Sequence, residues 1–389
     1  MRILQIHTRY RERGGEDLAV EAEADLLRKG GHEVIEWRAE NPAQPLAAAC
    51  DLALSAWNPA VANRAHAVAR RHRPDVAHVH NTWFALSASV LAGLRRARIP
   101  VVMTVHNYRL ICANGLLFRD GRPCDDCVRS GPWPAVRHRC YRDSTAASAA
   151  AASAIALHRR SRTWQDQVAL FLAPSEFTRE QLVAAGLERD HIRVSPHFVS
   201  DPGPRPVPAS AARTVLFAGR LSAEKGLHQV LDAWSAADTR GLELLLLGDG
   251  PLHGDLTRRL PPRARLGGTL SPAQLRETML RSRALVFPSR CYETFGRALA
   301  EAMAAGLAIL ASDLGAGGEL ARTVSEDACI RGGEVPGGDV DAWVRGFHRL
   351  LDDAFVEETS RRARAVYEQR FTPALGLRHL LEAYESVTA

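Results

Sequence analysis

The stretch FPSRCYETFGRALAEAMAAGLAILAS, at Phe287–Ser312, decides the fold of this chain. Its pattern predicts a strand, a polar loop, a helix and a second strand, at Arg283–Phe287, after Pro288, at Thr294–Ala305 and at Leu307–Ala311. Strand, loop, helix and strand make the repeating unit of a parallel α/β sheet. Ligands bind such sheets at the carboxyl ends of the strands, which is where this loop lies.

Two carboxylates mark this unit, Glu293 in the loop and Glu301 inside the helix. Counted from Phe295 at about 1.5 Å per residue, Glu301 lies roughly 9 Å along the helix. The N–H groups near Gly296 and Arg297 face the loop, and a helix N-terminus binds anions. A nucleotide sugar, with hydroxyls at both ends and a diphosphate between them, fits this spacing. A solvated helix residue beside an N-terminal helix charge fits it equally well.

The segment ETFGRALAEAMAAG resembles the E-x7-E motif of retaining glycosyltransferases with the GT-B fold, the bacterial glycosyl transferases of group 1. That group includes glycogen synthase and mannosyltransferases of envelope polysaccharides. The resemblance implies that Glu293 holds the hydroxyls of the donor sugar and that Glu301 holds the nucleotide ribose. It also implies that the donor phosphates meet the backbone between them, at Thr294, Phe295, Gly296 and Arg297. The implied fold is two Rossmann-like, doubly wound parallel sheets facing an interdomain crevice.

Length and composition support two ordinary domains, since 389 residues with 46% hydrophobic content can build two cores. The net charge of +6 favours solubility or attraction to phosphates, and no nucleic-acid-binding motif accompanies it. Seven unevenly spread cysteines argue against a secreted disulfide scaffold. The opening MRILQIHTRY does not resemble a secretory signal, and no uncharged run reaches the roughly 20 apolar residues of a membrane span. We expect a cytoplasmic protein and leave open contact with the inner face of the membrane.

The linker SDPGPRPVPAS, at Ser200–Ser210, marks the domain boundary because its four prolines exclude a helix or a central strand. We expect an acceptor-side domain over residues 1–200, with an insertion at 109–142. A nucleotide-sugar-binding domain follows over 201–371. The resemblance implies that the helix at 372–389 crosses back to the first domain.

The first domain carries two predicted contacts with the donor. In the loop Thr8–Glu16, the pair Gly14-Gly15 lets the backbone approach an anion, although the full G-x-G-x-x-G is absent. The strand Val101–His106 ends in polar residues, and a histidine there points into the ligand crevice. The resemblance places Gly15 against the donor diphosphate and His106 against the transferred sugar. A plain loop glycine and a structural histidine are the alternatives.

The second domain opens with a strand and GRLSAEKG, in which Gly219 permits a tight exit and Arg220 and Lys225 project from one loop. Two cations there fit a departing diphosphate, and an exposed basic turn is the alternative. In the resembling family this motif carries the Arg and Lys that hold the donor phosphates. By the same resemblance, Gly250 in a G-D-G-P turn lies near the nucleotide and Leu270 near the base. Residues Asp313–Glu319 resemble the glycine-rich turn of the family, although its usual proline is missing.

Four cysteines lie in the insertion, at Cys112, Cys124, Cys127 and Cys140. The C-x-x-C pair has zinc-knuckle spacing, and the outer two flank it at similar distances. Structural zinc, reduced cysteines without a ligand, and an iron–sulfur cluster or disulfides are the three interpretations. The loop reads as too polar and kinked to pack alone, so a metal would stabilise it. Its seven arginines against three aspartates suit a lipid surface or a lipid-linked diphosphate acceptor, or are simply solvated. A single Ala-rich helix is predicted next, over Ser144–Trp164.

The predicted function is transfer of a sugar from a nucleotide-diphosphate sugar to an acceptor hydroxyl, with retention, in polysaccharide or other glycoconjugate biosynthesis. Closure brings His106 and Gly15 over the donor, while Arg220, Lys225 and the helix N-terminus stabilise the leaving diphosphate. We therefore expect no catalytic metal and no nucleic-acid partner. The alternatives are a glycosyltransferase of secondary metabolites, a nucleotide-sugar epimerase of the same fold, a zinc-loop nucleic-acid-binding protein and a non-catalytic scaffold.

Overall fold

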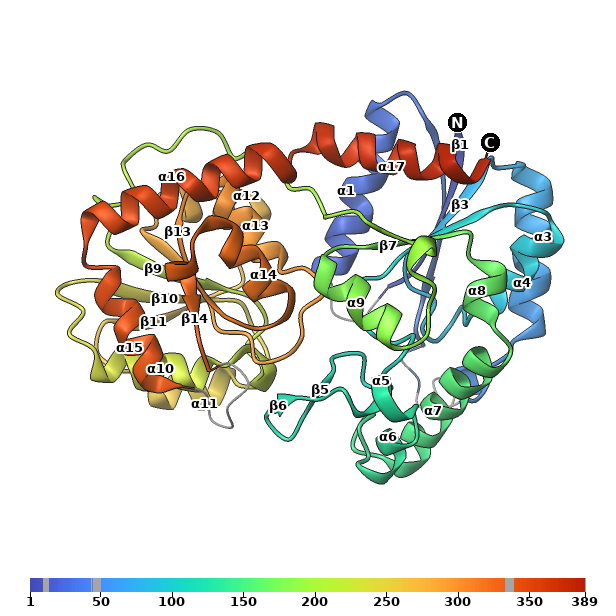
Figure 1. The fold of residues 1–389 in the computed structure, drawn as a ribbon, viewed down its shortest axis with the longest axis horizontal. Coiled ribbons are helices and arrows are strands. Elements are labelled where there is room, and N and C mark those ends of the chain that lie inside the picture. The colour runs from blue at the N-terminus through green and yellow to red at the C-terminus, as the bar shows by residue number, and fades with distance from the viewer. Residues whose placement is uncertain (10–13, 43, 45–49, 333–338, 389) are drawn as a thin grey trace. The chain divides into compact units, whose positions relative to one another are not determined.

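A computed structural model describes residues 1–9, 14–42, 44, 50–332 and 339–388. The chain divides into two compact units, each built on a six-stranded parallel sheet (Figure 1). The first unit comprises Met1–Leu117, Cys124–His197 and Ala374–Ala389, and the second comprises Phe118–Pro123 and Phe198–Pro373. Residues 10–13 of the predicted loop Thr8–Glu16 lie outside the described residues. The predicted α/β fold with two doubly wound sheets is confirmed.

The first sheet has the strand order β2-β1-β3-β4-β7-β8, and every pairing is parallel. The central strands are buried on both sides, which explains their continuous apolar sequences. The strands are β1 (Arg2–Arg9), β2 (Glu33–Glu40), β3 (Val76–Val79), β4 (Val101–Thr104), β7 (Leu170–Ala173) and β8 (Ile192–Val194).

The helices of the first unit follow the strands in alternation. They are α1 (Gly15–Lys29), α3 (Pro59–His72), α4 (Ser89–Arg96), α5 (Asp126–Ser130), α6 (Pro134–Arg137), α7 (Thr145–Arg160), α8 (Thr163–Gln167), α9 (Glu176–Ala184), the 3-10 turn η1 (Arg189–His191) and most of α17 (Pro373–Thr388). The single helix predicted over Ser144–Trp164 is wrong. The chain breaks between α7 and α8, where Arg162 adopts φ +49° and the Ser161 hydroxyl bonds back to the Leu157 carbonyl at 2.8 Å.

Helix α17 packs on the first sheet. Leu380, Ala383 and Tyr384 join a core cluster with residues of β1, β3, β4 and β7. The Tyr384 hydroxyl lies 2.7 Å from His78 Nδ1 on β3, so a polar contact fixes the helix where the apolar contacts place it. The last turns of the chain therefore belong to the first core, although 306 residues separate this pair.

The insertion is better packed than the sequence suggests. It buries Leu110, Ile111, Ala113, Leu117, Val128 and Tyr141, and part of it packs against α7 in one cluster. The expectation that this loop cannot pack alone is wrong, because its scattered apolar residues meet each other and α7. Its hairpin, β5 (Phe118–Arg119) with β6 (Arg122–Pro123), is the segment counted with the second unit.

The second sheet has the order β11-β10-β9-β12-β13-β14, again with parallel pairings. Two apolar clusters cover its two faces, one including α13 and α16 and the other α10 and α15. The strands are β9 (Thr214–Ala218), β10 (Glu243–Leu247), β11 (Ala264–Gly268), β12 (Ala284–Phe287), β13 (Ala308–Ser312) and β14 (Cys329–Ile330).

The helices of the second unit alternate with these strands. They are the 3-10 turns η2 (Ala223–Lys225) and η3 (Glu326–Ala328) and the helices α10 (Leu227–Ala236), α11 (His253–Arg259), α12 (Pro272–Leu280), α13 (Arg297–Ala304), α14 (Gly315–Val324), α15 (Val340–Arg349) and α16 (Asp353–Arg370). The predicted glycine-rich turn at Asp313–Glu319 is wrong after Leu314, because α14 begins at Gly315. Gly317 is needed for packing there, since a Cβ at this position would lie 2.9 Å from the Phe287 ring.

Two arginines, the half-buried Arg205 and the buried Arg283, hold the linker against the rest of the second unit. Arg205 donates to the carbonyls of Ala305 at 2.9 Å and Ser282 at 2.6 Å. Arg283 donates to the Leu350 carbonyl at 2.7 Å and also to the Ser210 carbonyl. The linker has no regular structure, as predicted from its prolines, and these guanidinium groups hold it in place instead.

Candidate active site

The loop after β9 carries the two predicted phosphate-binding cations. Gly219 leaves the strand, Arg220 is exposed, and Lys225 ends η2. The next residue, Gly226, has φ +66°, and a Cβ there would lie 2.1 Å from the Pro288 carbonyl oxygen. Glycine is required because any side chain would separate this loop from the loop after β12.

The loops after β9 and β12 meet in an ion pair between Lys225 and Glu293. Lys225 Nζ donates to Glu293 Oε1, and the Ser289 hydroxyl donates to the same oxygen at 2.6 Å. The backbone N–H of Arg290 donates to the Glu224 carbonyl at 2.7 Å, so the backbones are joined as well. The fold thus brings together the predicted cation and the predicted sugar-binding carboxylate, 68 residues apart in sequence.

Burial and pairing set the charge of this pair. Burial acts to raise the pKa of Glu293, but the Lys225 ammonium and the hydrogen bonds outweigh it and hold that pKa below its ordinary value. For Lys225, burial acts to lower the pKa, and the Glu293 carboxylate outweighs it and raises the pKa above its ordinary value. Both side chains are therefore charged at neutral pH, and fixed charge of this kind can stabilise a leaving anion without reorganising.

The helix that follows Glu293 begins later than predicted. Helix α13 starts at Arg297, because Gly296 adopts φ +94° and ends the loop. Glu301 consequently lies about 6 Å along the helix rather than about 9 Å. Thr294 is half-buried, whereas the Phe295 ring is buried against Phe371, so this phenylalanine can offer a ligand only its backbone.

Glu301 is held by Arg297 one turn earlier on α13. Arg297 Nε donates to Glu301 Oε1 at 2.9 Å. Burial raises the pKa of Glu301 above its ordinary value, and Arg297 only partly offsets this. A carboxylate with a raised pKa is a good hydrogen-bond acceptor for hydroxyls, which is consistent with the predicted ribose contact.

Two glycine turns close the site on the β10 side. A Cβ at Gly248 would lie 1.9 Å from the Gly219 carbonyl oxygen, and one at Gly250 would lie 2.5 Å from the Leu221 carbonyl oxygen. The backbone N–H of Leu221 donates to the Asp249 carbonyl at 2.9 Å. The predicted donor residues Gly219 and Gly250 are thus parts of one hydrogen-bonded backbone assembly. Leu270, the predicted base contact, packs partly buried against the core.

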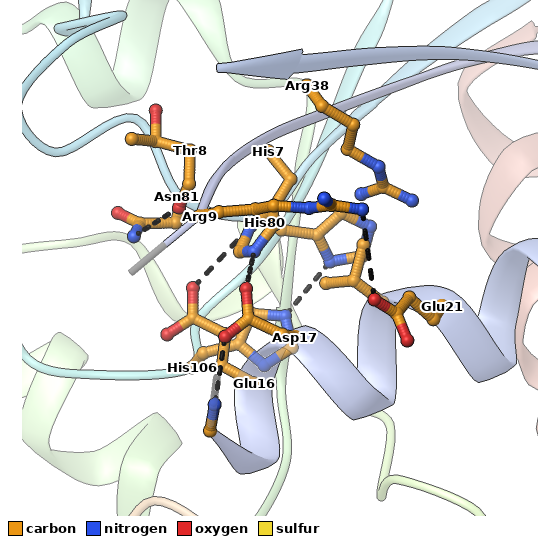
Figure 2. A network of polar contacts seen from close by, with 12 residues as sticks. His7, Thr8, Arg9, Glu16, Asp17, Glu21, Arg38, His80, Asn81 and His106 are labelled. Carbon is orange, nitrogen blue, oxygen red and sulfur yellow. Dashed lines mark hydrogen bonds and ion pairs between the residues drawn. The ribbon is translucent and has the colours of Figure 1, made fainter. Parts of the chain in front are cut away.

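In the first unit, His106 lies beside His80 in a buried polar network (Figure 2), and Glu23 belongs to the same network. His106 Nε2 is 2.9 Å from His80 Nδ1, and His80 Nε2 is 3.3 Å from Glu23 Oε1. The pKa of His106 lies well below its ordinary value, chiefly because the ring is buried and also because His197 and His80 are close to it. A neutral His106 suits the predicted role of polar contact rather than general acid.

The Glu23 carboxylate also contacts His78, so Glu23, His78 and His80 together resemble a metal site. Glu23, His78 and His80 offer ligand atoms within 4.8 Å of one another. His78 Nδ1 lies 2.7 Å from Glu23 Oε1, whereas zinc ligands in a tetrahedral site stand about 3.3 Å apart or more. His78 Nε2 is also engaged, at 2.8 Å from the Thr104 hydroxyl. The separations are those of hydrogen bonds, so this group is a structural network.

Gly15 is the first residue of α1, but two carboxylates share that turn. Figure 2 shows Glu16 and Asp17 beside His7. Asp17 accepts from the Gly14 N–H at 3.0 Å and lies 2.9 Å from His7 Nε2. The helix N-terminus is therefore already balanced by a carboxylate, which favours a backbone contact from Gly15 over an anion cradle.

A pocket opens beside His106 in the first unit. It is lined by Asn81, Trp83, His106, Arg109 and His158, with the apolar residues Ala154 and Ile155 of α7 on one side. The Arg109 guanidinium lies 5.7 Å from the Trp83 ring centroid and 5.3 Å from that of Tyr141. Sequence reasoning did not find this pocket, because its walls come from four separated segments.

Two family models match the chain and identify its class. The model of Glycosyltransferase Family 4 matches residues 14–201, and the model of Glycosyl transferases group 1 matches residues 212–353. Together with the two parallel sheets, these matches define a GT-B glycosyltransferase. The chain belongs to the glycosyl transferases of group 1.

Solved structures agree on the fold. HepE of Anabaena, solved with UDP, is 19% identical over 99% of this chain and 100% of its own, with a TM-score of 0.68. Sucrose-phosphate synthase of Thermosynechococcus elongatus is 17% identical over 99% and 98%, with a TM-score of 0.70. WaaG, a glycosyltransferase involved in lipopolysaccharide biosynthesis, is 12% identical over 100% of both chains, with a TM-score of 0.65. A search of curated proteins finds no match.

Proposed function

We propose that this glycosyltransferase moves a hexosyl group from a nucleotide-diphosphate sugar to an acceptor hydroxyl, with retention of anomeric configuration. The observation that carries the proposal is the Lys225–Glu293 pair at the start of α13. It sets a cation and a carboxylate side by side at the carboxyl end of a parallel sheet. The structures of HepE in complex with UDP and with UDP-glucose support a donor of this class.

Each donor group has a role in this proposal. Glu293 accepts hydrogen bonds from the sugar hydroxyls, and Glu301 accepts them from the ribose. Arg220 and Lys225 neutralise the diphosphate, together with the backbone N–H groups at the start of α13. These cations supply the charge that a catalytic metal would otherwise bring, so we propose catalysis without one.

The transfer itself forms one bond and breaks one. The acceptor oxygen bonds to the anomeric carbon on the face that the diphosphate leaves, and the bond from that carbon to the phosphate oxygen breaks. The hydroxyl proton leaves with the nucleoside diphosphate. His106, held neutral by its surroundings, contacts the sugar, and Gly15 contributes a backbone contact.

We propose that the acceptor belongs to a polysaccharide or another glycoconjugate. The pocket beside His106 combines aromatic rings, amides and the Arg109 guanidinium, which suits a sugar or a lipid-linked diphosphate. Among the described residues, no helix is long and apolar enough to cross a membrane. Any membrane contact would therefore be made by surface groups, such as the exposed Trp133 and the arginines around it.

The test is thermal unfolding of the purified chain against a panel of nucleotide sugars. A ligand that binds the folded chain raises the midpoint, by about 2.7 kcal/mol of stability at 100 times Kd. Arg220→Ala should abolish the rise, whereas Arg361→Ala, an exposed arginine on α16, should leave it unchanged. Incubation without acceptor, followed for an epimer or free sugar, separates transfer from epimerisation. A folded wild-type chain that no nucleotide sugar stabilises would refute the proposal.

A further inference from the structure

The four insertion cysteines are brought into one neighbourhood by the fold. Cys124 follows the hairpin directly, with its N–H on the Leu117 carbonyl at 2.8 Å, and Cys127 lies in the first turn of α5. Cys112 and Cys127 are both buried, and Cys112, Cys124 and Cys140 all lie near enough to Cys127 to raise the pKa of its thiol. None of these four described cysteines forms a disulfide.

The surroundings of these cysteines suit a metal that binds sulfur. Cys127 belongs to a buried apolar cluster, and Cys140 packs against that cluster. Zinc binds the thiolate and not the thiol, so binding would release the protons of the cysteines.

We propose that Cys112, Cys124, Cys127 and Cys140 bind one zinc ion in a closed, structural site. Four sulfur ligands leave the ion no open position, so the site takes no part in transfer. Its physical role is to tie the two ends of the hairpin segment to α5 and to the start of α7, since the ligands flank these elements in sequence.

Zinc binding would tighten the present arrangement. Among the described residues, the ligand atoms of Glu23, His78 and His80 lie within 4.8 Å of one another. No three of the four described cysteine sulfurs lie that close together. The Cys112 sulfur also lies 3.0 Å from Asn114 Oδ1, a contact that a neutral thiol makes as donor. Binding would replace that contact and bring the sulfurs to about 2.3 Å from the ion.

The experiment measures metal in the wild-type chain first, so it does not depend on a variant that folds. Protein purified without chelator should contain about one zinc per chain, and X-ray absorption should show four sulfur neighbours at about 2.3 Å. A mercurial reagent that blocks thiols should release this zinc. Cys127→Ser should lose it, whereas Cys50→Ser, an exposed cysteine elsewhere, should keep it.

Several outcomes would overturn the proposal. They are a folded chain with no zinc after dialysis against it, iron in place of zinc, a mass that shows disulfides, or nitrogen and oxygen neighbours in the absorption spectrum. Zinc retained by Cys127→Ser but lost by Glu23→Gln would place the ion in the histidine network instead. None of these measurements depends on turnover, so failure here leaves the proposed function standing.

Discussion

Gly226 and Gly268 form a matched pair that tests how closely the donor loops approach each other. Both lie in the second unit and both have φ +66°. A Cβ at Gly268 would meet nothing within 4 Å, whereas one at Gly226 would lie 2.1 Å from the Pro288 carbonyl oxygen. The two alanine variants therefore share the cost of left-handed backbone and differ in the clash.

The magnitudes follow from these contacts. Left-handed backbone costs alanine about 1–2 kcal/mol, partly offset by about 0.4–1 kcal/mol from the less flexible unfolded chain, so Gly268→Ala should lose about 1 kcal/mol. Gly226→Ala should lose a further 1–3 kcal/mol or so, because the Pro288 backbone must move. At about 2–4 °C per kcal/mol, its midpoint should fall roughly 2–12 °C below that of Gly268→Ala.

The assay is thermal unfolding of both variants beside the wild-type chain, at one protein concentration and without ligand. Circular dichroism would report the whole fold, and fluorescence of Trp234 and Trp343, isolated by replacing the other tryptophans, would report the second unit. Equal midpoints for the two variants would refute the argument, because they would show that the Lys225 loop does not depend on close contact with the loop after β12.

Three further predictions rest on single contacts. Lys225→Met and Glu293→Gln should each lose about 2–3 kcal/mol of stability, because each leaves the partner's charge unpaired. In a denaturant titration, the double variant should lose less than the sum of the two single losses. Additive losses would show that the pair is not coupled. Burial lowers the pKa of His80 to about 3, so as pH falls the unfolded chain binds a proton at this histidine near pH 6.5, before the folded chain does. The free energy of unfolding should therefore fall by about 1.4 kcal/mol per pH unit as pH drops from about 6.5 towards 3. His80→Gln should flatten that slope. Arg283→Met should lose about 3–5 kcal/mol, because buried carbonyls lose their donor and Asp353 loses its partner; a loss below 1 kcal/mol would show that water replaces the guanidinium.

The sequence predicted the parts of this fold that local pattern controls. The strands around the E-x7-E segment lie within a residue of their predicted bounds, because apolar runs bounded by proline and glycine leave few alternatives. Lys225 and Glu293, predicted separately as donor contacts, meet because the carboxyl ends of adjacent parallel strands share one edge.

What the sequence could not show was set by tertiary contacts. Glu23 reads as one of several residues of an acidic helix, yet it is buried beside His78 of β3 and His80 just after that strand. Gly317 reads as a turn residue, yet it lies inside α14, where glycine is needed because Phe287 occupies the space of a side chain. Helix α13 begins three residues later than predicted, because the positive φ at Gly296 cannot be read from the hydrophobic pattern.

The hydrogen-bonded glycine turns at the ends of β9 and β10 have a consequence for altering specificity. Their backbones approach within distances that admit no Cβ, so variation at these glycines would disrupt the scaffold before it changed the substrate. Diversity should be better tolerated at Leu270 and Thr294, which are half-buried and where no close backbone approach depends on the absence of a Cβ. A library restricted to those two positions should retain folded members while sampling different bases and sugars, whereas one that spans the turns should yield mostly insoluble chains.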